Sequence, residues 1–185
     1  MSHVFIRVAC LLLTAGVVAC TPPMNWREVR PSSTRLQALM PCKPDEAVRS
    51  VNLLDGSPVQ MHLAGCDAGG ATFIIGWADV SRGRLGAMLG AWQDSTLTLA
   101  GVASGPDAPA GTRFVPAGTL ELPQAVRLQA TGLSPDGGVL PLDAAWFADS
   151  GGPGALEGQA LFAAIYRAPS EPAAATSFFS GLRLR

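Results

Sequence analysis

The chain has 185 residues, 48% hydrophobic and 15% charged, which is enough apolar material to bury a core and excludes a disordered protein. Its 13 Lys and Arg residues stand against 14 Asp and Glu residues, for a net charge of −1 without a basic cluster, so the sequence predicts no nucleic-acid partner. The 21 glycines and 15 prolines are typical of many short strands joined by tight turns.

The first twenty residues have the layout of a secretory signal, because Arg7 precedes an apolar run from Val8 to Val18. As a helix this run would be only about 16 Å long, short of the roughly 30 Å hydrocarbon core that a membrane span must cross. The four residues VVAC that end at Cys20 resemble the bacterial lipoprotein box, in which the signal is cut before a cysteine that then receives lipid.

That resemblance implies three segments: a signal peptide over residues 1–19, a lipidated tether over residues 20–25, and a single globular domain over residues 26–185. It also implies palmitate-type acylation at Cys20, and Thr21 behind it favours the outer membrane, with the domain facing the periplasm. The alternative is ordinary cleavage in the same region, with Cys20 left as a spare thiol.

The remaining cysteines divide by position, because Cys10 leaves with the signal and only Cys42 and Cys66 stay in the folded part. Two cysteines in an oxidising compartment usually pair, so we expect a Cys42–Cys66 disulfide. The alternatives are a redox site, or a metal site that adds His62, although neither C-x-x-C spacing nor a clear fourth ligand is present.

The first half of the domain predicts strands followed by a helix. Residues 36–40 alternate, and residues 47–54 and 58–65 flank Asp55-Gly56, a strong hairpin signal. Residues 71–80 form a buried-looking third strand. Behind Ser81, a candidate N-cap, apolar residues recur at helical spacing from Leu85 to Trp92, among glycines that weaken a helix or let a sheet approach it.

The second half repeats the pattern. After a Gly, Pro and Ala-rich loop at residues 101–111, strand signals return over residues 112–118, 124–132, 138–148 and 158–168, with a turn at residues 134–138. Ser170 is a candidate cap for a final helix that buries Phe178, Phe179 and Leu182.

Segregated strands and helices predict an α+β fold: an antiparallel sheet of about seven strands packed with two main helices. The strand ending in LMPCKP, the Ala/Gly-rich helix and the closing helix with paired phenylalanines resemble uncharacterised bacterial lipoproteins and, through them, the PsbP-like fold. The resemblance implies an accessory or partner-binding domain and carries no catalytic motif.

One motif suggests catalysis. Ser150 lies in DSGGP, the sequence around the nucleophile of chymotrypsin-like proteases, and His62 is the one histidine of the mature chain. A serine hydroxyl needs a base that takes its proton. However, the surroundings of His62 differ from the protease pattern, and a loop between two strands explains the glycines.

The sequence therefore predicts a non-enzymatic lipoprotein domain without cofactor or metal. It would bind an envelope protein through its sheet or the loops at residues 101–111 and 149–158. The alternative is a carrier of a small ligand or hydrophobic cargo in a groove between helix and sheet, and the remote alternative is a serine hydrolase using Ser150 and His62.

Overall fold

The structure is a computed structural model and describes residues 24–54, 57–102 and 109–185. A seven-stranded antiparallel sheet has the order β3-β4-β5-β9-β8-β7-β6, and a three-stranded antiparallel sheet has the order β1-β2-β10. The strands of the large sheet are β3 (Asp45–Leu54), β4 (Ser57–Ala68), β5 (Ala71–Ser81), β6 (Thr112–Arg113), β7 (Val126–Leu133), β8 (Val139–Asp149) and β9 (Glu157–Tyr166). Those of the small sheet are β1 (Arg27–Val29), β2 (Leu36–Met40) and β10 (Arg183–Leu184).

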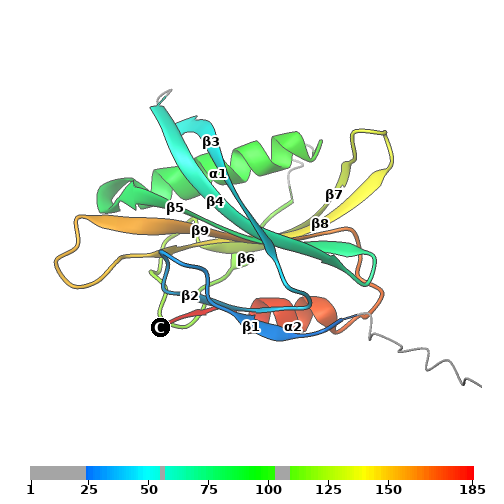
Figure 1. The fold of residues 1–185 in the computed structure, drawn as a ribbon. Coiled ribbons are helices and arrows are strands. Elements are labelled where there is room, and N and C mark those ends of the chain that lie inside the picture. Colours follow the sequence, from blue (N-terminus) through cyan, green and yellow to red (C-terminus); the bar gives the residue numbers. More distant parts are fainter. Residues whose placement is uncertain (1–23, 55–56, 103–108) are drawn as a thin grey trace, which may run out of the picture.

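The elements form three layers (Figure 1), with the large sheet between helix α1 (Leu85–Leu99) on one face and helix α2 (Ala174–Ser180) with the small sheet on the other. Each face of the sheet has its own apolar core. Trp92 of α1 and Trp146 of β8 belong to the first core, and Trp77 of β5 and Phe178 of α2 belong to the second. Strands 10 to 12 residues long with apolar side chains on both faces account for this division.

The expectation of an antiparallel α+β fold is confirmed, although strands make up most of it. The hairpin of β3 and β4 has the predicted partners, with its turn at residues 55–56 outside the described residues. The turn after β7 is also confirmed, because Ser134 N donates to Gly138 O over 2.8 Å. The sequence did not predict the small sheet, and the strand expected at residues 112–118 shrinks to the two residues of β6.

Both predicted helix caps are wrong. Ser81 ends β5, and a 3₁₀ turn (Arg82–Arg84) follows it, so that α1 begins at Leu85 without a side-chain cap. The backbone N–H of Ser170 donates to Gly69 O over 2.7 Å, which uses this residue in a loop, and α2 begins four residues later. The predicted burial of Phe178, Phe179 and Leu182 is confirmed.

Helix α1 lies close to the large sheet mainly because of glycines in the sheet, and less because of glycines in the helix. A methyl group on Gly76 of β5 would come within 3.2 Å of the Trp92 ring, and one on Gly132 of β7 would collide with Ala100 O at the end of α1. By contrast, Gly83 and Gly90 face open space. The sequence predicted that glycines of the helix would let helix and sheet approach closely. The approach depends instead on glycines of the facing strands.

Candidate functional site

The cysteine pair is confirmed as a disulfide between Cys42 and Cys66. Cys42 lies in the turn between β2 and β3 and Cys66 lies in β4, so the bond ties the small sheet to the large one. Since both sulfur atoms are used in the bond, neither is available as a metal ligand or a redox thiol. No group of three or more His, Cys, Asp or Glu side chains in the described parts of the chain could hold a metal ion. Cys20 lies outside the described residues.

The structure does not bring Ser150 and His62 together. His62 lies on β4 and stacks on Trp77 of β5, with ring centroids 5.3 Å apart. Ser150 follows the end of β8, two strands beyond β5 in the sheet, and its hydroxyl donates to Gly151 O over 3.3 Å. Three strand spacings of roughly 4.8 Å each separate the strands concerned, far more than the hydrogen-bond distance that a serine and its base require.

The aspartate of the DSGGP motif stabilises the loop around it. Asp149 is buried and accepts hydrogen bonds from the Arg35 guanidinium and from Gly151 N. A cavity of about 440 Å³ beside this loop is lined mainly by polar residues and glycines, and Gln159 across it donates to Ser33 O and to Asp79 Oδ1 over 2.7 and 2.8 Å. Because these polar groups hydrogen-bond with one another, the first part of the 149–158 loop has a structural role.

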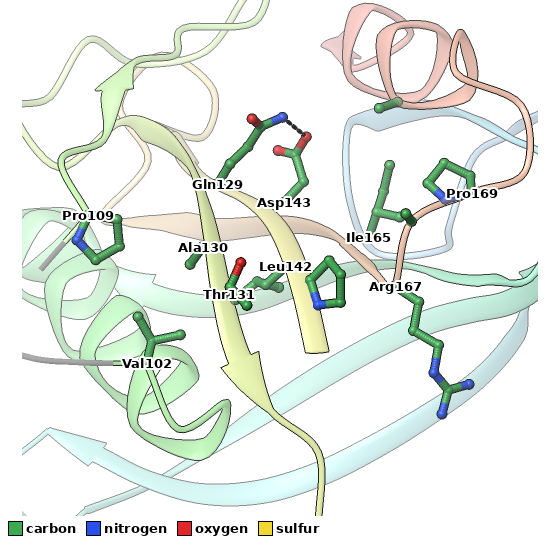
Figure 2. A pocket seen from close by; sticks show the side chains of 13 residues that line it. Val102, Pro109, Gln129, Ala130, Thr131, Leu142, Asp143, Ile165, Arg167 and Pro169 are labelled. Atoms are coloured by element: carbon green, nitrogen blue, oxygen red, sulfur yellow. Dashed lines mark hydrogen bonds between the residues drawn. The ribbon is translucent and has the colours of Figure 1, made fainter. Parts of the chain in front are cut away.

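A cavity of about 580 Å³ lies on the α2 side of β7, β8 and β9 (Figure 2). Gln129 and Asp143 point toward one another in it, and Gln129 Nε2 donates to Asp143 Oδ2 over 2.9 Å. Arg127 adds two bonds to the same carboxylate, at 2.8 and 2.7 Å, and its guanidinium lies 3.7 Å from the centre of the Phe179 ring. The carboxylate is thus already neutralised, while Arg167 extends away from it (Figure 2).

A groove of about 340 Å³ lies between α1 and the opposite face of the sheet. We call it the α1 groove. Most of its walls are apolar. The lining residues are Val51, Asn52, Leu53, Met61, Leu63, Ile74, Trp92, Ser95, Thr96, Leu99, Ala100, Leu140, Phe162 and Tyr166. Trp92 stacks on Phe162 at 5.2 Å, which gives the floor two broad aromatic surfaces. Leu99 at the rim has 83% of its surface exposed.

The polar groups of the α1 groove are few. The Thr96 hydroxyl donates to Trp92 O over 2.8 Å, so its own helix satisfies it. Burial raises the pKa of the Tyr166 phenol above its usual value of 10, because the phenolate would lose its hydration. A mostly apolar cavity with a few polar groups is the usual form of a small-ligand site. No nucleophile and base meet among the residues that line it.

The sequence predicted an alternative ligand site in a groove between helix and sheet, where the α1 groove lies, but it did not predict the size or the lining of this groove. It predicted the helix and the strands that enclose it, but the walls of the groove combine α1 with residues of β3, β4, β5, β8 and β9. The signals were the glycines in β5 and β7 and the apolar Leu99 at the helix end. The loop predicted to bind at residues 101–111 falls largely outside the described residues.

Comparison of the chain with protein-family models, with curated proteins and with solved structures finds no match. Over the residues that the structure describes, no helix has the length and apolar character needed to cross a bilayer. The assignment of a function therefore depends on the geometry of this chain alone.

Proposed function

We propose that the protein is a non-enzymatic envelope lipoprotein, tethered through acylated Cys20 to the periplasmic face of the outer membrane, that binds an apolar ligand in the α1 groove. The VVAC sequence before residue 21 supports the tether, and the Cys42–Cys66 disulfide suits an oxidising compartment. The PsbP-like fold is part of this proposal, and the order of strands and helices supports it.

The observation that carries the choice of ligand is the apolar lining of the α1 groove. The volume of the groove, about 340 Å³, is at the lower end of the range for small-molecule sites, and an extended acyl chain could lie along it. Each methylene moved from water into such a site contributes about 0.8 kcal/mol. The groove thus favours a lipid acyl chain or a similar hydrophobic cargo over a polar metabolite.

A protein partner is the second candidate, favoured by the outer edge of β3. This ten-residue strand pairs only with β4 among the described strands, so its second row of backbone N–H and C=O groups faces outward. A partner could add a strand there, with specificity from alternate side chains. Charged side chains on an edge strand prevent unspecific pairing with other chains. Asp45, Glu46 and Arg49 are such exposed charges on β3.

Binding of a fluorescent palmitate to the purified protein tests the proposal. We expect saturable binding that unlabelled palmitate displaces. Ser95 lines the groove from α1, so Ser95→Phe should fill the space and weaken binding at least tenfold. Thr98→Phe places the same ring on an exposed part of the same helix and should leave binding unchanged.

Equal affinities for wild type and both variants would remove the α1 groove as the binding site. If palmitate does not bind at all, the envelope partner becomes the better proposal. Crosslinking in intact cells should then capture one dominant protein that is lost when a proline replaces Ser50 in β3.

A further inference from the structure

The folded domain begins at a definite place. Met24 is buried in the core beside α2, and Asn25 N donates to Pro41 O over 2.7 Å. A methyl group on Gly69 would collide with the Met24 side chain and contact Ser170, so the chain enters between the β4–β5 turn and the loop before α2. Figure 1 shows this entry on the α2 side of the large sheet.

The β7–β8 hairpin lies at the same end of the sheet. Thr72, just after the β4–β5 turn, pairs with Tyr166 at the end of β9, and Tyr166 pairs with Leu142 near the start of β8. Leu133 and Val139 pair with each other at the base of the hairpin turn. The β7–β8 hairpin and the entry of the chain at Met24 thus lie at the same end of the large sheet.

Two apolar side chains are exposed on this hairpin. Leu133 has 56% and Val139 has 71% of its surface exposed. Because side chains alternate along a strand, Leu133 shares a face with Arg127, whose guanidinium lies over Phe179 of α2. Leu133 and Val139 therefore lie on the same face of the sheet, as well as at the same end, as the entry of the chain.

The length of the tether brings this end to the membrane. Three residues lie between Cys20 and Met24, and the four steps of a fully extended chain span at most about 3.6 Å each, or about 14 Å in all. If Cys20 is acylated, as the proposed function holds, the end of the domain that carries Met24 lies within that distance of the lipid headgroups.

We propose that Leu133 and Val139 form a contact surface for the bilayer that holds the lipid anchor. The surface rests on the proposed anchoring at Cys20 and adds an orientation to it. Arg167, exposed at the end of β9, then lies at the level of the lipid phosphates, and Leu99 at the rim of the α1 groove lies at the same end. A ligand could thus pass from the membrane to the groove without crossing the whole domain.

The acidic groups at this end limit how deep the contact can be. Asp136 in the hairpin turn accepts a hydrogen bond from Ser134, which holds its pKa below the usual value, and Asp67 lies near the β4–β5 turn. The Asp136 carboxylate stays charged near neutral pH and remains among the headgroups. The contact is therefore shallow, with the two apolar side chains reaching just below the headgroup layer.

Site-specific labels on the lipidated protein test the proposal. A single cysteine at position 133, 139 or 156 is labelled with an environment-sensitive fluorophore, with Cys42 and Cys66 oxidised. The proteins are inserted into vesicles of phosphatidylethanolamine and phosphatidylglycerol. Leu156 is the matched control, because it is apolar and 88% exposed but lies in the β8–β9 loop at the opposite end of the sheet.

We expect labels at 133 and 139 to shift toward blue emission, and a nitroxide-bearing lipid to quench them several-fold more than the label at 156. Equal quenching at all three positions on firmly bound protein would overturn the membrane contact. A blue shift that persists in detergent and depends on protein concentration would also overturn it, in favour of a second copy of the chain. Protein that washes off the vesicles, with Cys20 open to thiol reagents, would contradict the anchor and hence the proposed function.

Discussion

Arg35 and Asp149 form a two-point ion pair between residues 114 positions apart in the sequence. Arg35 Nε donates to Asp149 Oδ2 over 2.9 Å, and Nη2 donates to Oδ1. Arg35 Nη1 also donates to Arg185 O over 3.2 Å. One guanidinium thus joins the segment before β2, the end of β8 and the last residue of the chain, which are the places where the two sheets meet.

The first prediction concerns this ion pair. Arg35→Met should lower the free energy of unfolding by about 2 kcal/mol, because it leaves the buried Asp149 carboxylate without its cation. The cost stays below that of a fully buried pair, since 45% of the Arg35 side chain is exposed. Urea denaturation measures it.

Arg49→Met is the control. Arg49 is exposed on β3, where its guanidinium donates a hydrogen bond to the adjacent Val48 O, and its replacement should change stability by less than about 0.5 kcal/mol. Equal effects of the two substitutions would mean that the Arg35–Asp149 pair contributes no more than a surface charge.

The second prediction concerns the Cys42–Cys66 bond, which closes a loop of 24 residues. Replacing both cysteines by alanine should reduce the free energy of unfolding by about 3 kcal/mol, because the unfolded chain gains the entropy of the open loop. Denaturation in urea measures the loss, and wild-type protein should lose a similar amount when a reductant is added. A double variant as stable as the oxidised protein would show that the link between the sheets is dispensable.

Local patterns predicted most of the large sheet. Alternation and turn residues are properties of short segments, so the β3–β4 hairpin and the turn at residues 134–138 could be read from the sequence. The disulfide could be predicted because sorting the cysteines left only two in the domain. The buried strand expected at residues 71–80, which contains Trp77, and the apolar helix face that ends at Trp92 could likewise be predicted from local patterns, and both tryptophans are buried.

Long-range relationships could not be predicted in the same way. The strand β10 has two residues and exists because Leu184 can pair with Leu36, at the other end of the domain. Ser81 and Ser170 looked like caps, but tertiary context placed the first in β5 and gave the second a bond to Gly69. The lining of the α1 groove likewise combines α1 with residues of β3, β4, β5, β8 and β9, which no local pattern brings together.

The third prediction uses Tyr166, the only tyrosine of the chain, which lines the α1 groove. Its phenol should titrate above pH 10, because burial raises its pKa, and absorbance near 295 nm follows this residue alone. At a pH between the unfolded and the folded pKa of Tyr166, the phenol is deprotonated in the unfolded state but still protonated in the folded state. Tyr166 therefore stabilises the fold fully below pH 10, and that contribution is lost as the pH rises through the folded pKa.

Two further measurements test whether the titration of Tyr166 reports on the α1 groove. Palmitate bound in the α1 groove should exclude water from the phenol and move the absorbance midpoint to still higher pH. Tyr166→Phe should abolish the absorbance change and remove this residue's share of the loss of stability above pH 10. A midpoint at or below 10 in the folded protein would mean that water reaches the phenol freely, and the groove would then be too wet to hold an acyl chain.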